Sequence, residues 1–271
     1  MSTLCAVLGV QRSSYYAWQH RPVDTQQIQL QLQAQAIHRR SRRAAGSRTI
    51  AKTLGVSRWR ARKLMQAGQL VSKQPGPRKF RRAQAEAEAV PNQLNRAFRP
   101  TAPNRVWCGD ITYVRVAGQW AYLAVVLDLY ARRVVGWKVS ESPDTTLVTQ
   151  ALGRAVETRQ PTEGLLFHSD QGVQYRSRRY QQYLQRHQIS QSMSRKGNCW
   201  DNAPMERLFR SLKTEWMPRH GYRSLQESIH DVGEYLMGYY NRKRVHSYNN
   251  YVTPEMQEYR WQPPKPVSIN T

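Results

Sequence analysis

Three consecutive segments in the second half of the chain show the apolar spacing of β-strands. Val106–Val116 alternates around Asp110 and Thr112, and Trp120–Asp128 is a nearly continuous apolar run. A short apolar run of this kind is typical of a strand buried on both faces of a sheet. Arg133–Ser140 completes the set, so we expect three strands in succession.

Helical spacing follows these strands. After Asp144 the apolar residues recur every three or four positions, at Leu147, Ala151, Leu152, Ala155 and Val156, which predicts a helix as far as Arg159. The elements expected next are a strand at Leu165–His168, a helix at Arg176–His187, a strand at Ile189–Met193, and helices at Pro204–Trp216 and Leu225–Tyr240. Strands interspersed with helices favour a mixed α/β layered core.

The first third of the chain predicts pairs of short helices. Residues 1–21 suggest two helices around a glycine turn, and Ser47–Leu54 and Arg58–Gln66 flank a second turn, at whose end Ser57 can cap the following helix. This last helix carries four cations, Arg58, Arg60, Arg62 and Lys63. The pattern favours a helix-turn-helix that binds DNA; the alternative is a basic helix pair within a bundle.

Charge strengthens the interpretation of DNA binding. The chain has 42 Lys and Arg against 18 Asp and Glu, a formal charge of +24, and residues 1–100 hold 19 of the cations and three of the acids. Such an imbalance favours a polyanionic partner over a merely soluble basic protein. The segment Gln74–Arg82 contains Arg78, Lys79, Arg81 and Arg82 among prolines and glycine, which predicts an extended linker along a DNA backbone.

Cysteine usage and hydropathy exclude other classes. The three cysteines are far apart and no Cys-x-x-Cys pair occurs, so neither a disulfide framework nor a cysteine zinc knuckle is supported. The longest apolar run, Trp120–Leu127, is far shorter than the ~20 residues that span a bilayer. The N-terminus lacks the pattern of a signal peptide. We therefore expect a cytoplasmic protein without a membrane partner.

Three acids on different predicted elements form a candidate metal site. Asp110 lies on the first strand, which we expect to be central, Asp170 follows the fourth strand, and Glu206 lies in the first turn of a helix. Open α/β sheets bind ligands beyond strand ends, so the three carboxylates can converge there. Two Mg²⁺ ions held by carboxylates can activate an attacking hydroxyl and stabilise the leaving oxygen. Asp110 would bridge the ions, and Asp170 and Glu206 would each complete one site.

Cations near these acids suit a DNA strand held over metal. Arg210 and Lys213 follow Glu206 by four and seven residues and share its helix face, and Arg195 and Lys196 lie in the loop before that helix. The alternative is an ordinary amphipathic helix with a solvated glutamate. Tyr175 and Trp200, in polar segments, are candidates for stacking on a base or sugar.

Two further titratable residues are expected to be structural. Asp128 can approach the metals, but an ion pair with Arg132 or Arg133 is favoured, and His168 is expected in the core. No nucleophile signature or phosphate-binding glycine loop occurs, which disfavours covalent hydrolysis and ATP use.

Long motifs in this order resemble one protein family. WCGDITYV, LDLYARRVVGW, HSDQGVQY, SRKGNCWDNAPMERLFRSLKTEW and YYNRKRVHSYNNYVTPEM are similar to the DDE transposases of the insertion-sequence-three family, specifically to the product of its second reading frame. The resemblance covers roughly residues 26–260. It implies a ribonuclease-H-like fold shared with retroviral integrases, with a mixed five-stranded sheet flanked by helices and an all-α helix-turn-helix region in front.

The resemblance also implies a function. The family's three metal-binding acids match Asp110, Asp170 and Glu206, its usual basic residue matches Lys213, and its helix-turn-helix matches residues 26–75. The implied cofactor is Mg²⁺, as two ions that Mn²⁺ can replace. The implied activity is cleavage at terminal inverted repeats and joining of the 3′ hydroxyl to DNA, by a homo-oligomer on double-stranded DNA in the nucleoid of a bacterium.

The domain organisation and the rival functions follow. We expect an N-terminal helical segment at 1–24, a helix-turn-helix at 25–74, a basic linker at 75–100, a catalytic core at 101–245 and a tail at 246–271. The chain shows no His/Cys zinc domain and no sustained heptad, so a protein from the upstream reading frame is a further candidate partner. The rival functions are a non-catalytic DNA-binding regulator and a nuclease of the same fold that only cuts.

Overall fold

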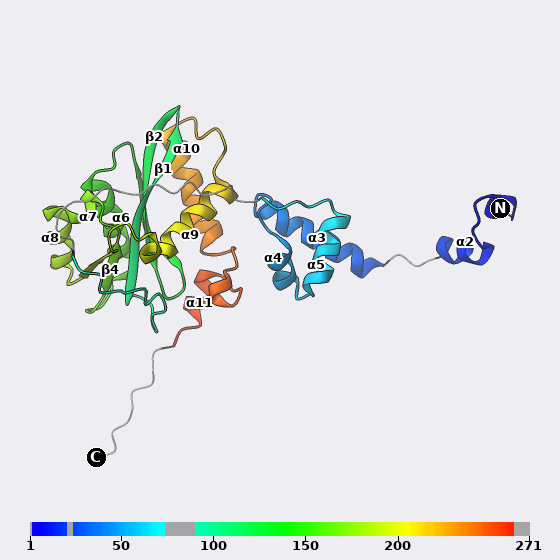
Figure 1. Cartoon of the computed structure of the whole chain (residues 1–271), viewed down its shortest axis with the longest axis horizontal. Coiled ribbons are helices and arrows are strands. Elements are labelled where there is room, and N and C mark those ends of the chain that lie inside the picture. Colours follow the sequence, from blue (N-terminus) through cyan, green and yellow to red (C-terminus); the bar gives the residue numbers. More distant parts are fainter. Residues whose placement is uncertain (1, 21–23, 74–89, 263–271) are drawn as a thin grey trace, which may run out of the picture.

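A computed structural model describes residues 2–20, 24–73 and 90–262 (Figure 1). Its largest part is a sheet of five strands: β1 (Val106–Val116), β2 (Gln119–Asp128), β3 (Arg133–Ser140), β4 (Leu166–Ser169) and β5 (Ser190–Met193). Their order is β3-β2-β1-β4-β5; the β1–β2 and β2–β3 pairs are antiparallel, and the β1–β4 and β4–β5 pairs are parallel. The predicted mixed five-stranded sheet and the central position of the first strand are confirmed.

Successive residues of the strands pack into two different cores, one on each face of the sheet. On β2, Leu123, Val125 and Leu127 belong to the first core, and Ala124 and Val126 belong to the second. Because side chains alternate across a strand, a continuous apolar run is what burial on both faces requires. The first core also contains residues of α9 (Ala203–Ser211) and α10 (Leu225–Gly233), and the second contains residues of α6 (Thr145–Arg159) and α8 (Arg178–Arg186).

Two of the predicted helices differ in detail from the structure. The helix expected at Arg176–His187 is divided into α7 (Val173–Arg176) and α8 because Ser177 has extended backbone and caps α8 through its hydroxyl. The helix expected at Pro204–Trp216 is α9 followed by a wider π-helical segment, η2 (Leu212–Trp216). The spacing of apolar residues along the sequence does not distinguish a single wider π-helical turn from a continuous α-helix. In the same way α10 continues as a π-helical segment, η3 (Glu234–Tyr240).

The N-terminal region is helical as expected. It contains α1 (Ser2–Val7), α2 (Arg12–Gln19), α3 (Thr25–Arg40), α4 (Ser47–Leu54) and α5 (Arg58–Ala67). A small core that includes Ile50 and Leu64 joins α3, α4 and α5. Gly55 ends α4 in a left-handed conformation with φ +66°, which costs glycine little because it has no Cβ. The turn and the helix that follows it give the predicted helix-turn-helix.

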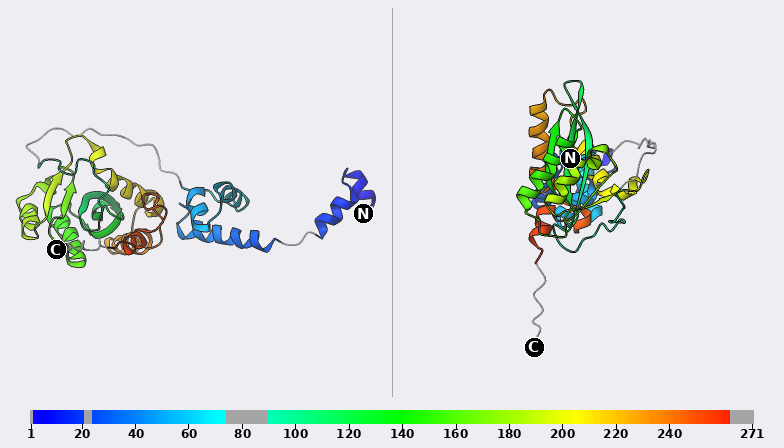
Figure 2. Two further views of the ribbon diagram at one scale, coloured as in Figure 1. Left: turned by 90° about the horizontal axis from the view of Figure 1, so that it is seen from below. Right: turned by 90° about the vertical axis from the view of Figure 1, so that its left-hand side faces the viewer.

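One arginine links the helix-turn-helix to the core. The Arg42 guanidinium lies 3.7 Å from the ring centroid of Trp216, its Nη2 donates to Asp231 Oδ1 at 2.7 Å, and its Nη1 donates to the Trp216 carbonyl. Lys73 Nζ donates to the Glu215 carbonyl at 3.2 Å. Two views at right angles show α3 to α5 beside the α9 and α10 side of the core, with α1 and α2 farther out (Figures 1 and 2).

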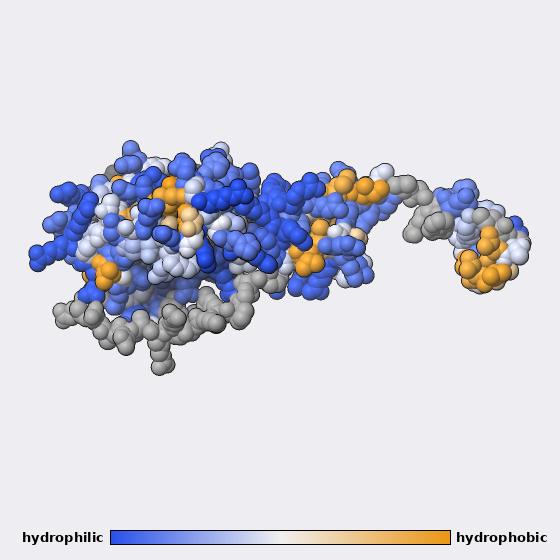
Figure 3. All heavy atoms as spheres, turned by 90° about the horizontal axis from the view of Figure 1, so that it is seen from above, coloured by the Kyte–Doolittle hydropathy of each residue, from blue (hydrophilic) through white to orange (hydrophobic). Residues whose placement is uncertain are grey.

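The exposed surface is mostly hydrophilic where the helix-turn-helix approaches the core, and apolar residues gather at the N-terminal helices (Figure 3). Leu4, Val7 and Leu8 are all exposed there. In the three described ranges of the chain, no helix has both the length and the apolar character needed to cross a bilayer.

The last described helix, α11 (Pro254–Tyr259), contacts the core through Glu258, which forms ion pairs with Arg133 and Arg159.

The contact between β3 and α6 gives a test of the packing. A Cβ added at Gly136 would overlap the Ala151 carbonyl and would lie 2.8 Å from the Ala155 Cβ. We expect Gly136→Ala to lower the free energy of unfolding by about 2 kcal/mol, because close-packed cores resist added methyl groups. Urea denaturation measures the change.

Gly153→Ala in α6 is the matched control. Its Cβ would meet only the Tyr183 hydroxyl, at 3.3 Å, and alanine favours helix over glycine by up to ~1 kcal/mol. Equal stability of the two variants would contradict the described packing of α6 on the sheet.

Candidate active site

The sheet places two of the predicted acids on neighbouring strands, with Asp110 inside β1 and Asp170 directly after β4. β4 is parallel to β1, and Cys108 is paired in register with His168. Asp110 and Asp170 each lie two residues farther along. Because the side-chain period of a strand is two, both carboxylates continue the same face and the same end of the sheet.

The third acid is carried by a helix anchored in the core. Met205 and Leu208 of α9 are buried, and Glu206 between them is partly buried. Just before α9, the Asn202 side chain lies 3.5 Å from the Gly109 carbonyl of β1, at the limit of a hydrogen bond. Pro204 lies in the first turn, as expected. The start of α9 is therefore held against the strand that carries Asp110.

The three carboxylates share one electrostatic environment. Burial raises the pKa of Asp110 well above its usual range, the charge of Asp170 adds to this increase, and that of Glu206 contributes less. The Ile111 N–H, which donates to Asp110 Oδ1 at 2.7 Å, and the Lys213 ammonium oppose the shift in the pKa of Asp110. Burial also raises the pKa of Asp170. Burial and the neighbouring carboxylates thus disfavour the ionised form of Asp110, and a nearby positive charge would favour it.

This charge and the donor types fit a divalent cation. Mg²⁺ prefers carboxylate oxygens, and Asp110, Asp170 and Glu206 supply them. Among the residues that the structure describes, no three acidic, histidine or cysteine side chains are yet gathered closely enough to hold an ion. Like charges repel, so a bound cation would favour a closer approach of the three carboxylates.

A buried aspartate that sequence reasoning missed fixes the loop before α9. Asp201 has a fully buried carboxylate that accepts hydrogen bonds from the Arg195 backbone N–H and guanidinium, from Arg96 Nε at 2.7 Å and from Asn92 Nδ2 at 3.0 Å. The Arg195 hydrogen bonds hold the pKa of Asp201 well below its usual range. The guanidinium of Arg195, predicted to contact DNA, is therefore engaged by Asp201.

Two further predictions about individual side chains were wrong. Tyr175 is 2% exposed, and its ring packs 5.3 Å from that of Tyr180, so it lies in the core and cannot stack on DNA. Asp128 pairs with Arg159, at 3.8 Å, and accepts from the backbone N–H groups of Asn104 and Tyr130. It therefore pairs with neither of the arginines that were expected to bind it.

Arg133 binds Glu255 and Glu258 instead, and Arg132 donates to the Phe98 carbonyl. The assignment of His168 to the core is confirmed, because its ring is fully buried between the Ser192 and Ser194 hydroxyls.

The residues predicted to contact DNA differ in how exposed they are. On α5, Arg58, Arg62 and Lys63 are exposed and Arg60 is partly buried, and Ser57 caps the helix as expected. Trp59 on the same helix is 69% exposed, a large apolar surface that charge counting overlooked. Lys196, Trp200, Arg210 and Lys213 are exposed near the acids. Arg78, Lys79, Arg81 and Arg82 lie outside the described residues.

Family models agree with this architecture. Two models described as integrase core domain match residues 100–199 and 187–254. With the strand order β3-β2-β1-β4-β5, they define the protein as one with an integrase-type, ribonuclease-H-like core.

Curated relatives narrow the class to a family. An uncharacterized 31 kDa protein of insertion element IS600 from Shigella sonnei is 38% identical over 262 residues, covering 93% of this chain and 96% of its own length. Transposase InsF of IS3A from Escherichia coli K12 is 34% identical over 269 residues, covering 95% and 93%. The chain belongs to the insertion-sequence-three family of transposases.

Solved structures with a similar fold include viral integrases. A simian T-cell lymphotropic virus intasome chain aligns over 84% of this chain and 77% of its own, with 16% identity and a TM-score of 0.48. The HTLV-2 integrase catalytic core with magnesium aligns over 59% of this chain and 99% of its own, with 18% identity and a TM-score of 0.43.

The buried Asp201 cluster gives a test of the loop. We expect Asp201→Asn to lower the free energy of unfolding by about 2 kcal/mol, because charged hydrogen bonds to both arginines are lost. Chemical denaturation measures this loss. Asp144→Asn is the control, since Asp144 caps α6 through Leu147 N–H and asparagine caps a helix equally well. An Asp201→Asn variant with an unchanged free energy of unfolding would show that the cluster does not hold the loop.

Proposed function

We propose that this protein is a DNA transposase that cuts at the terminal inverted repeats of an insertion sequence and joins the freed 3′ hydroxyl to target DNA with divalent metal. The observation that carries the proposal is the position of Asp110 within β1 beside Asp170, which directly follows the adjacent parallel strand β4, together with the effect of the Glu206 charge on the pKa of Asp110. Membership of a transposase family supports it independently.

The chemistry follows from these carboxylates. Asp110, Asp170 and Glu206 would hold the divalent metal through their carboxylate oxygens, with Asp110 common to both ions and Asp170 and Glu206 each serving one. Two Mg²⁺ ions, or Mn²⁺ in their place, supply Lewis acidity to the attacking and leaving oxygens of an in-line displacement. In the first step water attacks the phosphodiester and the 3′ oxygen leaves. In the second step that 3′ hydroxyl attacks a target phosphodiester, so one ester bond forms as another breaks.

The remaining residues hold the DNA. The ammonium of Lys213 lies within the field of Asp110, where it can bind a phosphate beside the reacting one. Arg58, Arg60, Arg62 and Lys63 bring a helix with a positive outer face to the double-stranded end, and Lys196 and Arg210 add positive charge near the acids. Since two ends must be joined, the active form is a homo-oligomer on DNA, alone or with a protein from the upstream frame.

The two rival functions make different predictions about the acids. A non-catalytic regulator needs no carboxylate for its effect on DNA. A cutting-only nuclease needs the same three acids but yields no joined product, and the fold alone permits both.

Removing one metal-binding carboxylate gives the direct test. We expect Asp110→Asn, Asp170→Asn and Glu206→Gln each to reduce strand transfer by a thousandfold or more, since a loss of ~4 kcal/mol of transition-state stabilisation has that effect. DNA binding should persist. The assay incubates labelled terminal-repeat DNA, identified by footprinting, with Mg²⁺ and resolves the cut and joined products on a gel.

Glu163→Gln, at an exposed acid away from the site, is the control and should retain activity. Unchanged joining by Asp170→Asn would favour the regulator, and cut ends without a joined product would favour the nuclease.

Salt tests the positive face of α5. Each phosphate contact contributes about 0.9 to the slope of log affinity against log salt concentration. We expect Arg58→Gln and Lys63→Gln each to lower that slope by roughly one, measured by fluorescence anisotropy with duplex DNA. Arg186→Gln, at an exposed arginine of α8, should leave it unchanged. An affinity for DNA that does not vary with salt would contradict phosphate-dominated binding.

A further inference from the structure

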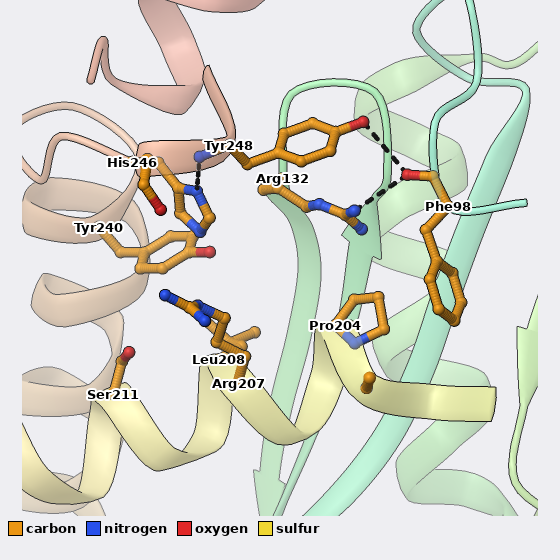
Figure 4. Close-up of a pocket in the computed structure, with 11 residues that line it drawn as sticks. Phe98, Arg132, Pro204, Arg207, Leu208, Ser211, Tyr240, His246 and Tyr248 are labelled. Carbon is orange, nitrogen blue, oxygen red and sulfur yellow. Dashed lines mark hydrogen bonds between the residues drawn. The ribbon is translucent and has the colours of Figure 1, made fainter. Parts of the chain in front are cut away.

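A pocket of about 340 Å³ lies beside α9, separate from the acids (Figure 4). Its walls come from α9, from the turn between β2 and β3, from the end of η3 and from the segment around His246. The residues that define its chemistry are Phe98, Arg132, Arg207, Tyr240, His246 and Tyr248. No acidic residue lines it.

A buried arginine in this pocket lacks a complete set of partners. Arg132 is 8% exposed, its Nη2 donates to the Phe98 carbonyl at 2.9 Å, and its guanidinium carbon lies 4.1 Å from the ring centroid of Tyr248. Its Nη1 is buried and has no hydrogen-bond partner. Figure 4 shows this end of the guanidinium directed into the pocket, away from the Phe98 carbonyl. A buried charged donor without an acceptor is costly, so the site is complete only when an acceptor enters.

The backbone supports the same conclusion. Arg132 has φ +56°, in the left-handed region that side chains other than those of glycine, asparagine and aspartate rarely adopt. Strain of this kind gathers where a side chain is held for a function. The fold therefore keeps Arg132 in an unfavourable conformation that directs its guanidinium inward.

The other polar groups in the pocket are also donors. His246 Nδ1 accepts from the Tyr248 backbone N–H at 3.2 Å, so the ring proton is on Nε2. Burial first, and then the positive charges of Arg244, Arg132 and Arg207, lower the pKa of His246 to about 3, so the ring is neutral at physiological pH. Because Arg244 is neutralised by Glu215, the uncompensated charge is that of Arg132 and Arg207. These donors select an anion.

The apolar walls select an anion that carries a flat group. Tyr240, Tyr248, Phe98 and Pro204 face the cavity from opposite sides (Figure 4). Aromatic faces of this kind stack on nucleobases with little dependence on sequence. A volume of about 340 Å³ is in the range of small-ligand pockets and suits a single nucleotide but not a duplex.

The pocket adjoins the acid site along one face of α9. Ala203, Arg207 and Ser211 recur every four residues and line both this pocket and a second cavity, which contains Glu206. Residues four apart share one helix face, so this row separates the two cavities. A strand bound at Glu206 therefore has a neighbouring nucleotide within reach of the pocket.

We propose that this pocket binds one unpaired nucleotide of the DNA strand, with its phosphate between Arg132 and Arg207 and its base against Tyr248. The proposal rests on the proposed function only in that DNA is the substrate. It adds a site for a nucleotide outside the duplex, next to the reacting phosphate.

Photochemical cross-linking tests the pocket without turnover. The full chain carrying Asp110→Asn is mixed with a single strand of about twelve nucleotides that contains one 5-iododeoxyuridine, illuminated, digested and analysed by mass spectrometry. We expect a cross-link on Tyr248, about tenfold weaker with Arg132→Gln or Arg207→Gln and unchanged with Arg186→Gln. Arg207 is exposed, so its variant is informative even if Arg132→Gln fails to fold.

Competition and a paired probe complete the test. A deoxynucleoside monophosphate should reduce the cross-link and the nucleoside should not. Cross-links only at other residues, persistence of the Tyr248 cross-link in Arg207→Gln, or equal cross-linking of a fully paired duplex would each overturn the proposal.

The two proposals fail separately. Strand transfer by the wild type without this cross-link would refute the nucleotide pocket alone. The cross-link without strand transfer would refute the proposed chemistry and leave the pocket standing.

Discussion

The position of Asp110 within β1, beside Asp170 directly after the adjacent parallel strand β4, is the constraint on which the proposed chemistry depends. Asp110 and Asp170 extend from strands whose register is fixed by burial on both faces, so neither can move away without disturbing the core. Glu206 is held by the buried residues on either side of it in α9. Burial and the neighbouring acids disfavour ionised carboxylates there, and a divalent cation is a partner that would favour them.

The rest of the structure supports the start of α9. Asp201 joins the loop before the helix to Arg96 and Arg195, and Asn202 meets the backbone of β1. Arg42 ties the helix-turn-helix to Trp216 and Asp231 at the far end of the same region. DNA held by the N-terminal helices is thus mechanically connected to the helix that carries the third acid.

Local patterns were sufficient to predict the strands, and the identity of the three acids stays a prediction. The apolar run Trp120–Asp128 requires a strand that is buried on both faces of a sheet. The motifs around Asp110, Asp170 and Glu206 are long enough to identify a family. The failures concern contacts between distant residues. Asp128 pairs with Arg159, 31 positions away, and the polar sequence around Tyr175 does not reveal that its ring turns into the core. The Asp201 cluster and the incomplete partners of Arg132 likewise depend on side chains brought together only by folding.

Crystals soaked in Mn²⁺, with the protein bound to a DNA end, provide the most direct test of the central claim. Anomalous diffraction locates the ions independently of the carboxylates. The account predicts peaks at about 2.2 Å, a little beyond the Mg²⁺–oxygen distance, from oxygens of Asp110, Asp170 and Glu206, with Asp110 shared between two ions. Peaks that lie elsewhere, or a DNA-bound site in which one of these three carboxylates contacts no ion, would contradict it.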